Sequence, residues 1–192
     1  MTTPQTGRRP SGLLVGSLVA ISFGTVFVLV NSGGLAAPWP WVIRVVGLLV
    51  AAFLVVALLR VARREPAATG GPATGFMDRR YWIVVAVEAV ALFGGLNVIN
   101  RVLHRPEISV AWVALVVGVH FFGLGWVWRM PRYHWLGAVM TALGLAGFVI
   151  HALGGGAATV ALVAGVGSGL ALYLTVALAL RDVSRDRTPV AG

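Results

Sequence analysis

The chain has 192 residues, of which 58% are hydrophobic and only 11% are charged. An average soluble domain has about 25% charged residues, so this composition excludes a soluble globule and indicates a protein that lies in lipid. The chain contains no cysteine, which excludes disulfides, thiolate metal sites and a cysteine nucleophile. Its 15 basic residues are all arginines and give a net charge of +9. These arginines lie at the ends of apolar segments, which favours a membrane surface over nucleic acid as their partner.

Apolar segments recur along the chain, and the length of each is close to the roughly 20 residues that a helix needs to cross a bilayer core. We therefore predict an all-α fold, a polytopic membrane helix bundle of six transmembrane helices within residues 12–180. The predicted spans are about 12–30, 41–59, 81–99, 108–128, 135–153 and 157–180. Residues 1–11 and 181–192 are predicted to be disordered cytoplasmic tails, and residues 60–80 a solvent-exposed cytoplasmic linker.

The first apolar segment follows Arg8 and Arg9, as the apolar region of a signal peptide would. It is longer than the roughly 7–15 residues of such a region, and Leu35-Ala36-Ala37 is a poor cleavage site, so we interpret it as the first span. Arg44 lies one turn inside the second span. We expect its guanidinium to extend back to the headgroups.

The third and fourth spans each carry one ionisable side chain well inside, Glu88 and His120. At a rise of about 1.5 Å per residue, both lie roughly 12 Å from the inner end of their spans. Spans joined by a short connection are usually neighbours, so the carboxylate and the imidazole are expected within hydrogen-bond reach. A charge in mid-bilayer costs at least about 2.5–3.5 kcal/mol, so Glu88 has to be protonated, paired or in contact with water.

Two interpretations of this polar centre stay open. In the first, Glu88 or His120 titrates as a polar solute binds or passes, which makes the pair a proton-sensitive site. In the second, the pair is an interhelical contact, worth about 0.6–2 kcal/mol, that holds two spans together and has no role in transport.

Other polar residues form weaker candidates. Asn97, Asn100 and His151 gather towards the outer side and could line an outer mouth of a pathway. The histidines lack the spacing of ligands on one helical face, so no metal site is predicted. The chain has neither a phosphate-binding loop after a strand nor a serine nucleophile elbow, and we therefore expect no enzyme and no cofactor.

Small residues recur every four positions in the last two predicted spans, at Ala138, Ala142, Ala146, Ala161, Gly165 and Gly169. Close backbone approach through small residues drives helix association in lipid, so these two ladders are expected to face each other or a neighbouring helix. The alternative is chance, because a chain with 25 glycines and many alanines produces such spacings freely.

The even-numbered spans share a pattern that ends in glycine, at residues 41–47, 112–118 and 159–165. If this pattern is a true repeat, the fold consists of three parallel helical hairpins. Chance alignment of segments rich in Val, Ala, Leu and Gly explains it equally well.

Arginine counts at the span ends predict the orientation, because cationic loops resist translocation. With the N-terminus inside, twelve of the fifteen arginines lie in inner regions, and only Arg101 and Arg105 lie in an outer connection. Arg44 is not counted because it lies within a span. Both termini are therefore predicted to be cytoplasmic, in a multi-pass protein of the cell membrane. The inner arginines should attract anionic lipid.

The segments Tyr81-Trp82, Glu88 and Trp112 to Phe122 resemble uncharacterised bacterial six-span integral membrane proteins that carry Glu in one span and a His-Phe-Phe motif in the next. In that family the motif continues as Pro-Leu, whereas this chain has Gly123-Leu124. The resemblance implies a small polytopic inner-membrane protein and implies no particular activity.

The preferred functional interpretation is a small transporter or permease-like protein with a proton-sensitive Glu88–His120 centre. The alternative is a non-catalytic membrane scaffold or regulatory subunit, in which this pair is purely structural. The partners expected in either case are the lipid bilayer and a second copy of the chain or another membrane protein.

Overall fold

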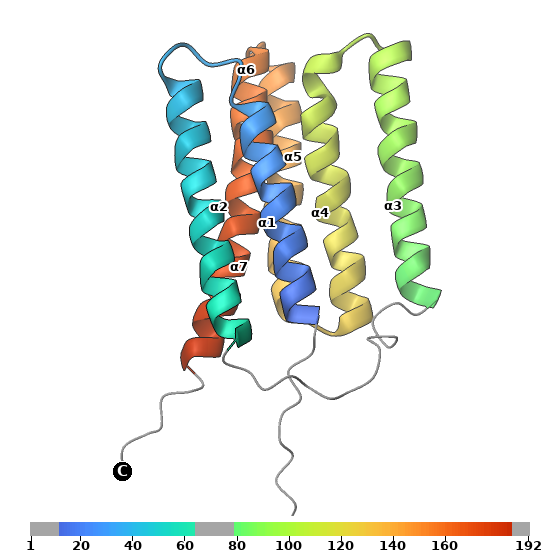
Figure 1. The fold of residues 1–192 in the computed structure, drawn as a ribbon. Helices are drawn as coiled ribbons and strands as arrows, with labels where there is room; N and C mark the ends of the chain where they lie inside the picture. The colour runs from blue at the N-terminus through green and yellow to red at the C-terminus, as the bar shows by residue number, and fades with distance from the viewer. Residues whose placement is uncertain (1–11, 64–78, 186–192) are drawn as a thin grey trace, which may run out of the picture.

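The computed structural model describes residues 12–63 and 79–185, all of them in helices or short connections (Figure 1). The helices are α1 (Gly12–Asn31), α2 (Trp39–Arg63), α3 (Arg79–Asn97), η1 (Val98–Val102), η2 (Pro106–Ile108), α4 (Ser109–Trp128), α5 (Pro131–Ala152), α6 (Ala157–Val160), η3 (Ala161–Val166) and α7 (Gly167–Arg185). The π-helical segments η1 and η3 continue α3 and α6 without a break, so each forms part of a longer helix.

Within these residues, six continuous helices are long and apolar enough to cross a membrane. They run over Leu13–Asn31, Trp39–Arg63, Arg79–Val102, Pro106–Trp128, Pro131–Ala152 and Ala157–Arg185. This confirms the predicted all-α fold and its six helices of span length.

The helices extend further than the predicted spans at their arginine-rich ends. Helix α2 continues to Arg63, α3 already begins at Arg79, and α7 continues to Arg185. Arginines in the last turn interact favourably with the negative end of the helix dipole, which lets α2 and α7 continue past the apolar residues. Part of the predicted linker and of the predicted tail is therefore helical. The remainder of both, 64–78 and 186–192, lies outside the described residues together with 1–11.

The helices stand side by side, with α3 at one edge of the bundle (Figure 1). Helix α4 packs most extensively against α5, while α7 packs against α1, α5 and α2. The largest buried cluster joins α1, α2 and α7 and includes Val28, Leu54, Leu58 and Tyr173. Helix α3 makes extensive contact only with α4, apart from its own continuation η1.

The predicted threefold repeat stays a prediction. Its three hairpins would be α1 with α2, α3 with α4, and α5 with α6 to α7. The helices in most extensive contact, α4 and α5, come from different hairpins, and so do α1 and α7. The bundle is therefore held together mainly by contacts between the predicted repeats.

The small-residue ladders do not face each other. On α5, Ala138 and Ala142 are exposed and Ala146 is half-buried, so this ladder turns away from the bundle interior. On the last long helix, Ala161 is half-buried, while Gly165 and Gly169 are buried.

The buried glycines of that last helix pack against α1, where Gly165 meets Asn31 and Gly169 meets the Gly24 carbonyl. The packing of α5 comes instead from Gly137, Gly144 and Gly147, which lie one or two positions along from the predicted ladder. The ladder of the last helix therefore faces a neighbouring helix, which was one of the two expected arrangements, whereas the ladder of α5 does not, because four-residue spacings occur on several faces of an Ala- and Gly-rich helix.

Arg44 is half-buried and binds the end of α1, a contact that the sequence did not predict. Its Nε donates to the Leu29 carbonyl oxygen at 3.2 Å and to the Ser32 Oγ at 3.1 Å. The last carbonyls of a helix have no partner within the helix, and they carry the negative end of its dipole. The guanidinium therefore satisfies the end of α1 and ties α1 to α2.

Replacing Arg44 by methionine is expected to lower the free energy of unfolding by about 1.5–3 kcal/mol, the usual contribution of hydrogen bonds to a charged group. Methionine keeps most of the apolar stem and removes the donors to Leu29 and Ser32. Thermal unfolding in detergent measures the effect, and Arg101→Gln, on an exposed residue, is the matched control. Equal melting temperatures for the two variants would contradict the assigned role.

Candidate functional site

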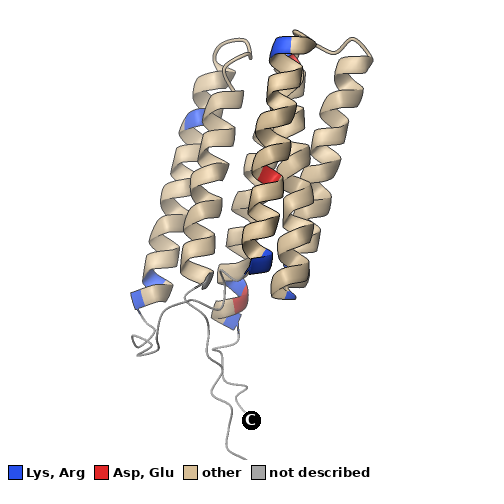
Figure 2. Cartoon of the chain, turned by 90° about the vertical axis from the view of Figure 1, so that its right-hand side faces the viewer, with Lys and Arg blue, Asp and Glu red and all other residues tan. Residues whose placement is uncertain are grey.

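The two ionisable side chains predicted to meet lie against each other halfway along the bundle. Nδ1 of His120 on α4 is 3.0 Å from Oε2 of Glu88 on α3. The side chains retain 11% and 22% of their exposure, so neither is fully sealed from its surroundings. Figure 2 shows an acidic position midway along the length of the bundle, apart from those near its ends. The depth count in the sequence therefore placed both residues at the same level.

The contact between the two groups is short, but it is not a well-directed hydrogen bond. The Nδ1 atom of His120 is buried and has no partner that meets the angular requirements of a hydrogen bond, despite the short distance to the carboxylate. Directional bonding is weak at poor angles, so the short distance by itself does not make this contact a strong hydrogen bond. Phe121 packs edge-on against the imidazole, with ring centroids 5.8 Å apart.

Aromatic contacts fix α3 to α4 on both sides of the pair. Towards η1, Trp112 Nε1 donates to the Ala91 carbonyl oxygen at 3.2 Å. Its indole covers Gly95, where any Cβ would overlap the ring. At the other end, Tyr81 stacks on Trp128 with ring centroids 5.9 Å apart. The polar pair thus lies between two aromatic contacts that set the distance between the helices.

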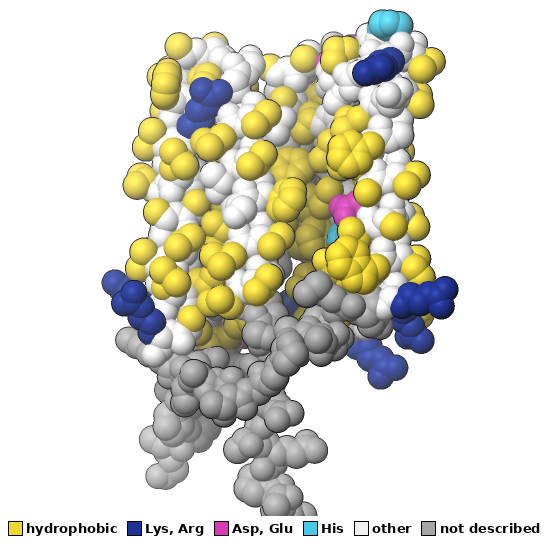
Figure 3. All heavy atoms as spheres, turned by 45° about the vertical axis from the view of Figure 1, so that its right-hand side comes forward, with side chains coloured by type: hydrophobic (Ala, Val, Ile, Leu, Met, Phe, Trp, Pro, Cys, Tyr) yellow, Lys and Arg dark blue, Asp and Glu magenta, His cyan; other side chains and the backbone are white. Residues whose placement is uncertain are grey.

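The pair lies beside an open flank of the molecule. No residue of Arg79–Asn97 is buried, and the outward side of α3 is apolar, with Val90 74% exposed. Figure 3 shows acidic and histidine side-chain atoms in a hollow next to this helix, midway along the bundle. The described part of the molecule has one cleft between α4 and α5 and another between α2 and α7. Neither cleft is lined by Glu88 or His120.

The residues predicted to line an outer mouth fall into different contacts. Asn97 is exposed. Nδ2 of Asn100 donates to the Leu96 carbonyl oxygen at 2.8 Å and to Ser109 Oγ at 3.2 Å, which ties η1 to α4. His151 lies instead next to Glu107, with Nε2 3.9 Å from Oε1. Asn100 and His151 thus contact residues at and just before the start of α4, and an outer mouth stays a prediction.

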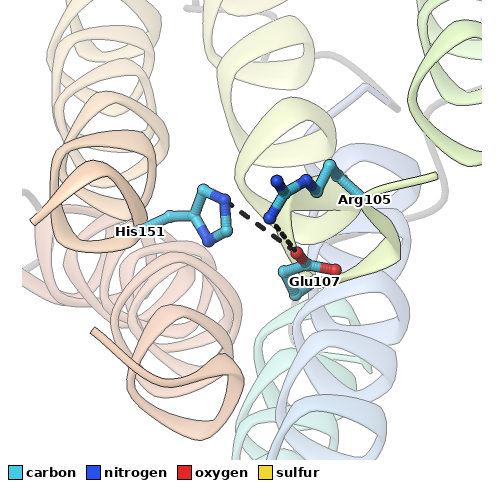
Figure 4. A network of polar contacts seen from close by, with 3 residues as sticks. All are labelled: Arg105, Glu107 and His151. Atoms are coloured by element: carbon cyan, nitrogen blue, oxygen red, sulfur yellow. Dashed lines mark ion pairs between the residues drawn. The ribbon is translucent and has the colours of Figure 1, made fainter. Parts of the chain in front are cut away.

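Glu107 is a polar residue that the sequence analysis did not single out. Its Oε1 is 3.7 Å from Arg105 Nη1 as well as 3.9 Å from His151, so one carboxylate faces two basic groups from different elements (Figure 4). Arg105 is 60% exposed, and exposed pairs of this kind contribute about 0–1 kcal/mol. Glu107 could have been noticed in the sequence because it lies two residues after Arg105 in a short connection. Its contact with His151 could not, because that contact depends on the tertiary fold.

Among the described residues, no three potential metal ligands of the His, Cys, Asp or Glu type come together.

The sequence analysis also did not single out two buried hydroxyls that have no hydrogen-bond partner, Thr141 Oγ1 on α5 and Ser168 Oγ on α7. Serine and threonine are common in helices of this composition, so sequence alone does not distinguish them from locally bonded hydroxyls such as that of Thr175.

Comparison of the chain with protein-family models, curated proteins and solved structures found no match. The resemblance to uncharacterised six-span membrane proteins therefore has no family match behind it. Its coarser implication stands on the helices themselves, which are those of a polytopic membrane protein.

Proposed function

We propose that this polytopic protein is a small permease-like transporter of the cytoplasmic membrane, with Glu88 and His120 as its proton-sensitive centre. The observation that carries the proposal is the 3.0 Å contact between a carboxylate and an imidazole inside two span-length apolar helices. Ionisable residues at this depth are costly, and in membrane proteins they often belong to proton relays or substrate pathways. Neither catalysis nor a cofactor forms part of the proposal.

The pair is suited to couple proton binding to helix position. A proton gained or lost by Oε2 of Glu88 or Nδ1 of His120 changes the attraction between α3 and α4, and charge interactions are strong where water is scarce. Because α3 makes extensive contact only with α4, a weaker pair frees α3 more than it would free any other long helix. A polar solute that replaces one member as partner of the other would have the same effect.

Proteoliposomes with a pH-sensitive dye inside test the proposal. Outward gradients of inorganic cations, amino acids and sugars are imposed in turn, and proton movement is recorded. We expect one solute class to drive proton movement with the native protein. Glu88→Gln and His120→Ala should reduce this movement at least about a hundredfold, the lower end of the range for a lost proton-transfer group. Val90→Ala, a change at an exposed residue of the same helix, should leave it unchanged.

The proposal fails if no solute class moves protons with the native protein, or if folded Glu88→Gln and His120→Ala proteins keep the native rate. Size-exclusion profiles and thermal unfolding establish that the variants are folded. A variant that loses both activity and fold is replaced by Glu88→Asp, which keeps the carboxylate and should retain part of the rate.

A second candidate function is a membrane scaffold or regulatory subunit, in which Glu88 and His120 only hold α3 against α4. The exposed apolar side of α3 favours it, since Val87, Val90 and Phe93 are 63%, 74% and 69% exposed. Such a surface suits another membrane protein or a second copy of the chain. This function predicts no solute-driven proton movement. It also predicts that Val90→Cys, in a chain without other cysteines, forms a cross-link to one defined partner in cell membranes.

The proposed orientation places both termini and the 60–80 linker in the cytoplasm. Because the chain has no cysteine, single cysteines report their side without background. Gly156→Cys, in the turn before α6 where a side chain meets nothing within 4 Å, should react with an impermeant maleimide in intact cells. Ala68→Cys should react only after permeabilisation. The reverse labelling pattern would place both termini outside.

A further inference from the structure

The turn between α4 and α5 forms a cleft whose lining combines apolar aromatic walls with basic groups. The cleft has a volume of about 560 Å³ and is lined by Gly125, Trp126, Arg129, Pro131, His134 and Trp135. We call it the α4–α5 cleft. The two indoles are 67% and 75% exposed, so both are available to a ligand from the bilayer.

Cationic groups lie at the end of α4 and on the neighbouring helix α3. Arg129 lines it, and Arg80 of α3 lies over the Trp126 ring, with its guanidinium carbon 5.6 Å from the ring centroid. The His134 ring lies so close to Gly125 that a Cβ there would be 2.6 Å from the imidazole. Of the acidic residues that the structure describes, Glu88 lies midway along α3, Glu107 in η2 at the opposite end and Asp182 on α7, and none of them lines the cleft. The cleft is therefore apolar inside and positive at its rim.

The backbone at Arg129 adds a second observation. Its φ is 53°, in the left-handed region where the end of a helix favours glycine, and its N–H bonds to the Gly125 carbonyl oxygen. An arginine in this conformation is strained relative to glycine. Glycine would therefore fit this backbone position better than arginine does.

We propose that the α4–α5 cleft binds one anionic phospholipid. The phosphate would pair with the Arg129 guanidinium, whose planar fork matches phosphate oxygens, with Arg80 as a second cation. One acyl chain would lie along Trp126 and Trp135, residues of the type that sits at the membrane interface. Basic pockets between transmembrane helices bind anionic lipid headgroups in this way. The proposal does not depend on transport by the Glu88–His120 pair.

Arg129→Gly is the sharpest test, because it removes the guanidinium while placing the preferred residue at the left-handed position. The native protein and the variant, both in neutral detergent, are titrated with phosphatidylglycerol or phosphatidylcholine, and bound lipid is counted by native mass spectrometry. We expect the variant to bind phosphatidylglycerol at least about fivefold more weakly, the factor for about 1 kcal/mol per arginine at a membrane surface. Its melting temperature should stay the same or rise.

The matched control is Arg63→Gln, which removes one exposed positive charge at the same end of the bundle, on α2, outside the cleft lining. It should change phosphatidylglycerol binding less than twofold. The proposal is overturned if Arg129→Gly and Arg63→Gln weaken binding equally, if phosphatidylcholine binds as well as phosphatidylglycerol, or if inorganic phosphate displaces the lipid at millimolar concentration. These outcomes would indicate, in this order, a general surface charge, an apolar lipid surface that does not recognise the headgroup, and a free-anion site.

Discussion

Replacing Gly144 by valine is expected to separate α4 from α5 and to leave little folded protein after extraction into detergent. A Cβ at this position would lie 2.6 Å from the Leu115 backbone nitrogen and 2.8 Å from the Ala111 carbonyl oxygen. Both atoms belong to the backbone of α4 and cannot rotate away as a side chain would. Overpacking typically costs about 1–3 kcal/mol, and we expect the upper end or more because a whole helix has to shift.

The control for Gly144→Val is Ala142→Val, which introduces the same side chain two residues earlier on an exposed part of the helix. This variant should give a native yield of monodisperse protein and a melting temperature within a few degrees of the native value. Ala142 belongs to the ladder that the sequence predicted as a packing surface. A larger loss of folded protein for Ala142→Val than for Gly144→Val would show that the predicted ladder is a packing surface. It would contradict the observed orientation of α5.

The second large effect is expected at the polar pair. His120→Leu should lower the free energy of unfolding by about 2–3 kcal/mol, because it leaves the Glu88 carboxylate without its partner in mid-membrane. The double variant with Glu88→Leu and His120→Leu removes both groups and should recover most of this loss. The resulting coupling energy is expected to be about 1–2 kcal/mol, above the average of about 0.6 kcal/mol for polar contacts between membrane helices.

Reversible unfolding in mixed micelles supplies the four free energies of this cycle, and transport assays on the same four proteins separate the two roles of the pair. If the pair is only structural, the double variant is stable and keeps whatever activity the native protein has. If the pair is the proton-sensitive centre, the double variant is stable and inactive. Additive single effects, within about 0.5 kcal/mol, would show that the two groups do not interact.

Part of the candidate site could be predicted from sequence because depth along a helix is a local quantity. A constant rise per residue places Glu88 and His120 at one level, and the short connection makes their helices neighbours. The contact of His151 with Glu107 had no such signal, since it joins η2 to a helix that is separated from it by the whole of α4. The α4–α5 cleft was likewise hidden, because it depends on the left-handed turn at Arg129.

The amino-acid sequence by itself determined the class of fold, the number of span-length helices and the level of the polar pair. Each follows from the composition and length of single segments, because a bilayer requires long apolar helices that satisfy their own backbone. Only the tertiary structure decided which side of each helix faces its neighbours. The side of α5 that carries Ala138, Ala142 and Ala146 was predicted to pack, and it turns away from the bundle interior. These helices are apolar all round, so no contrast between core and solvent marks the buried side. Helix facing in lipid depends on close shape matching, such as Gly144 against the α4 backbone, and such matching exists only between assembled helices.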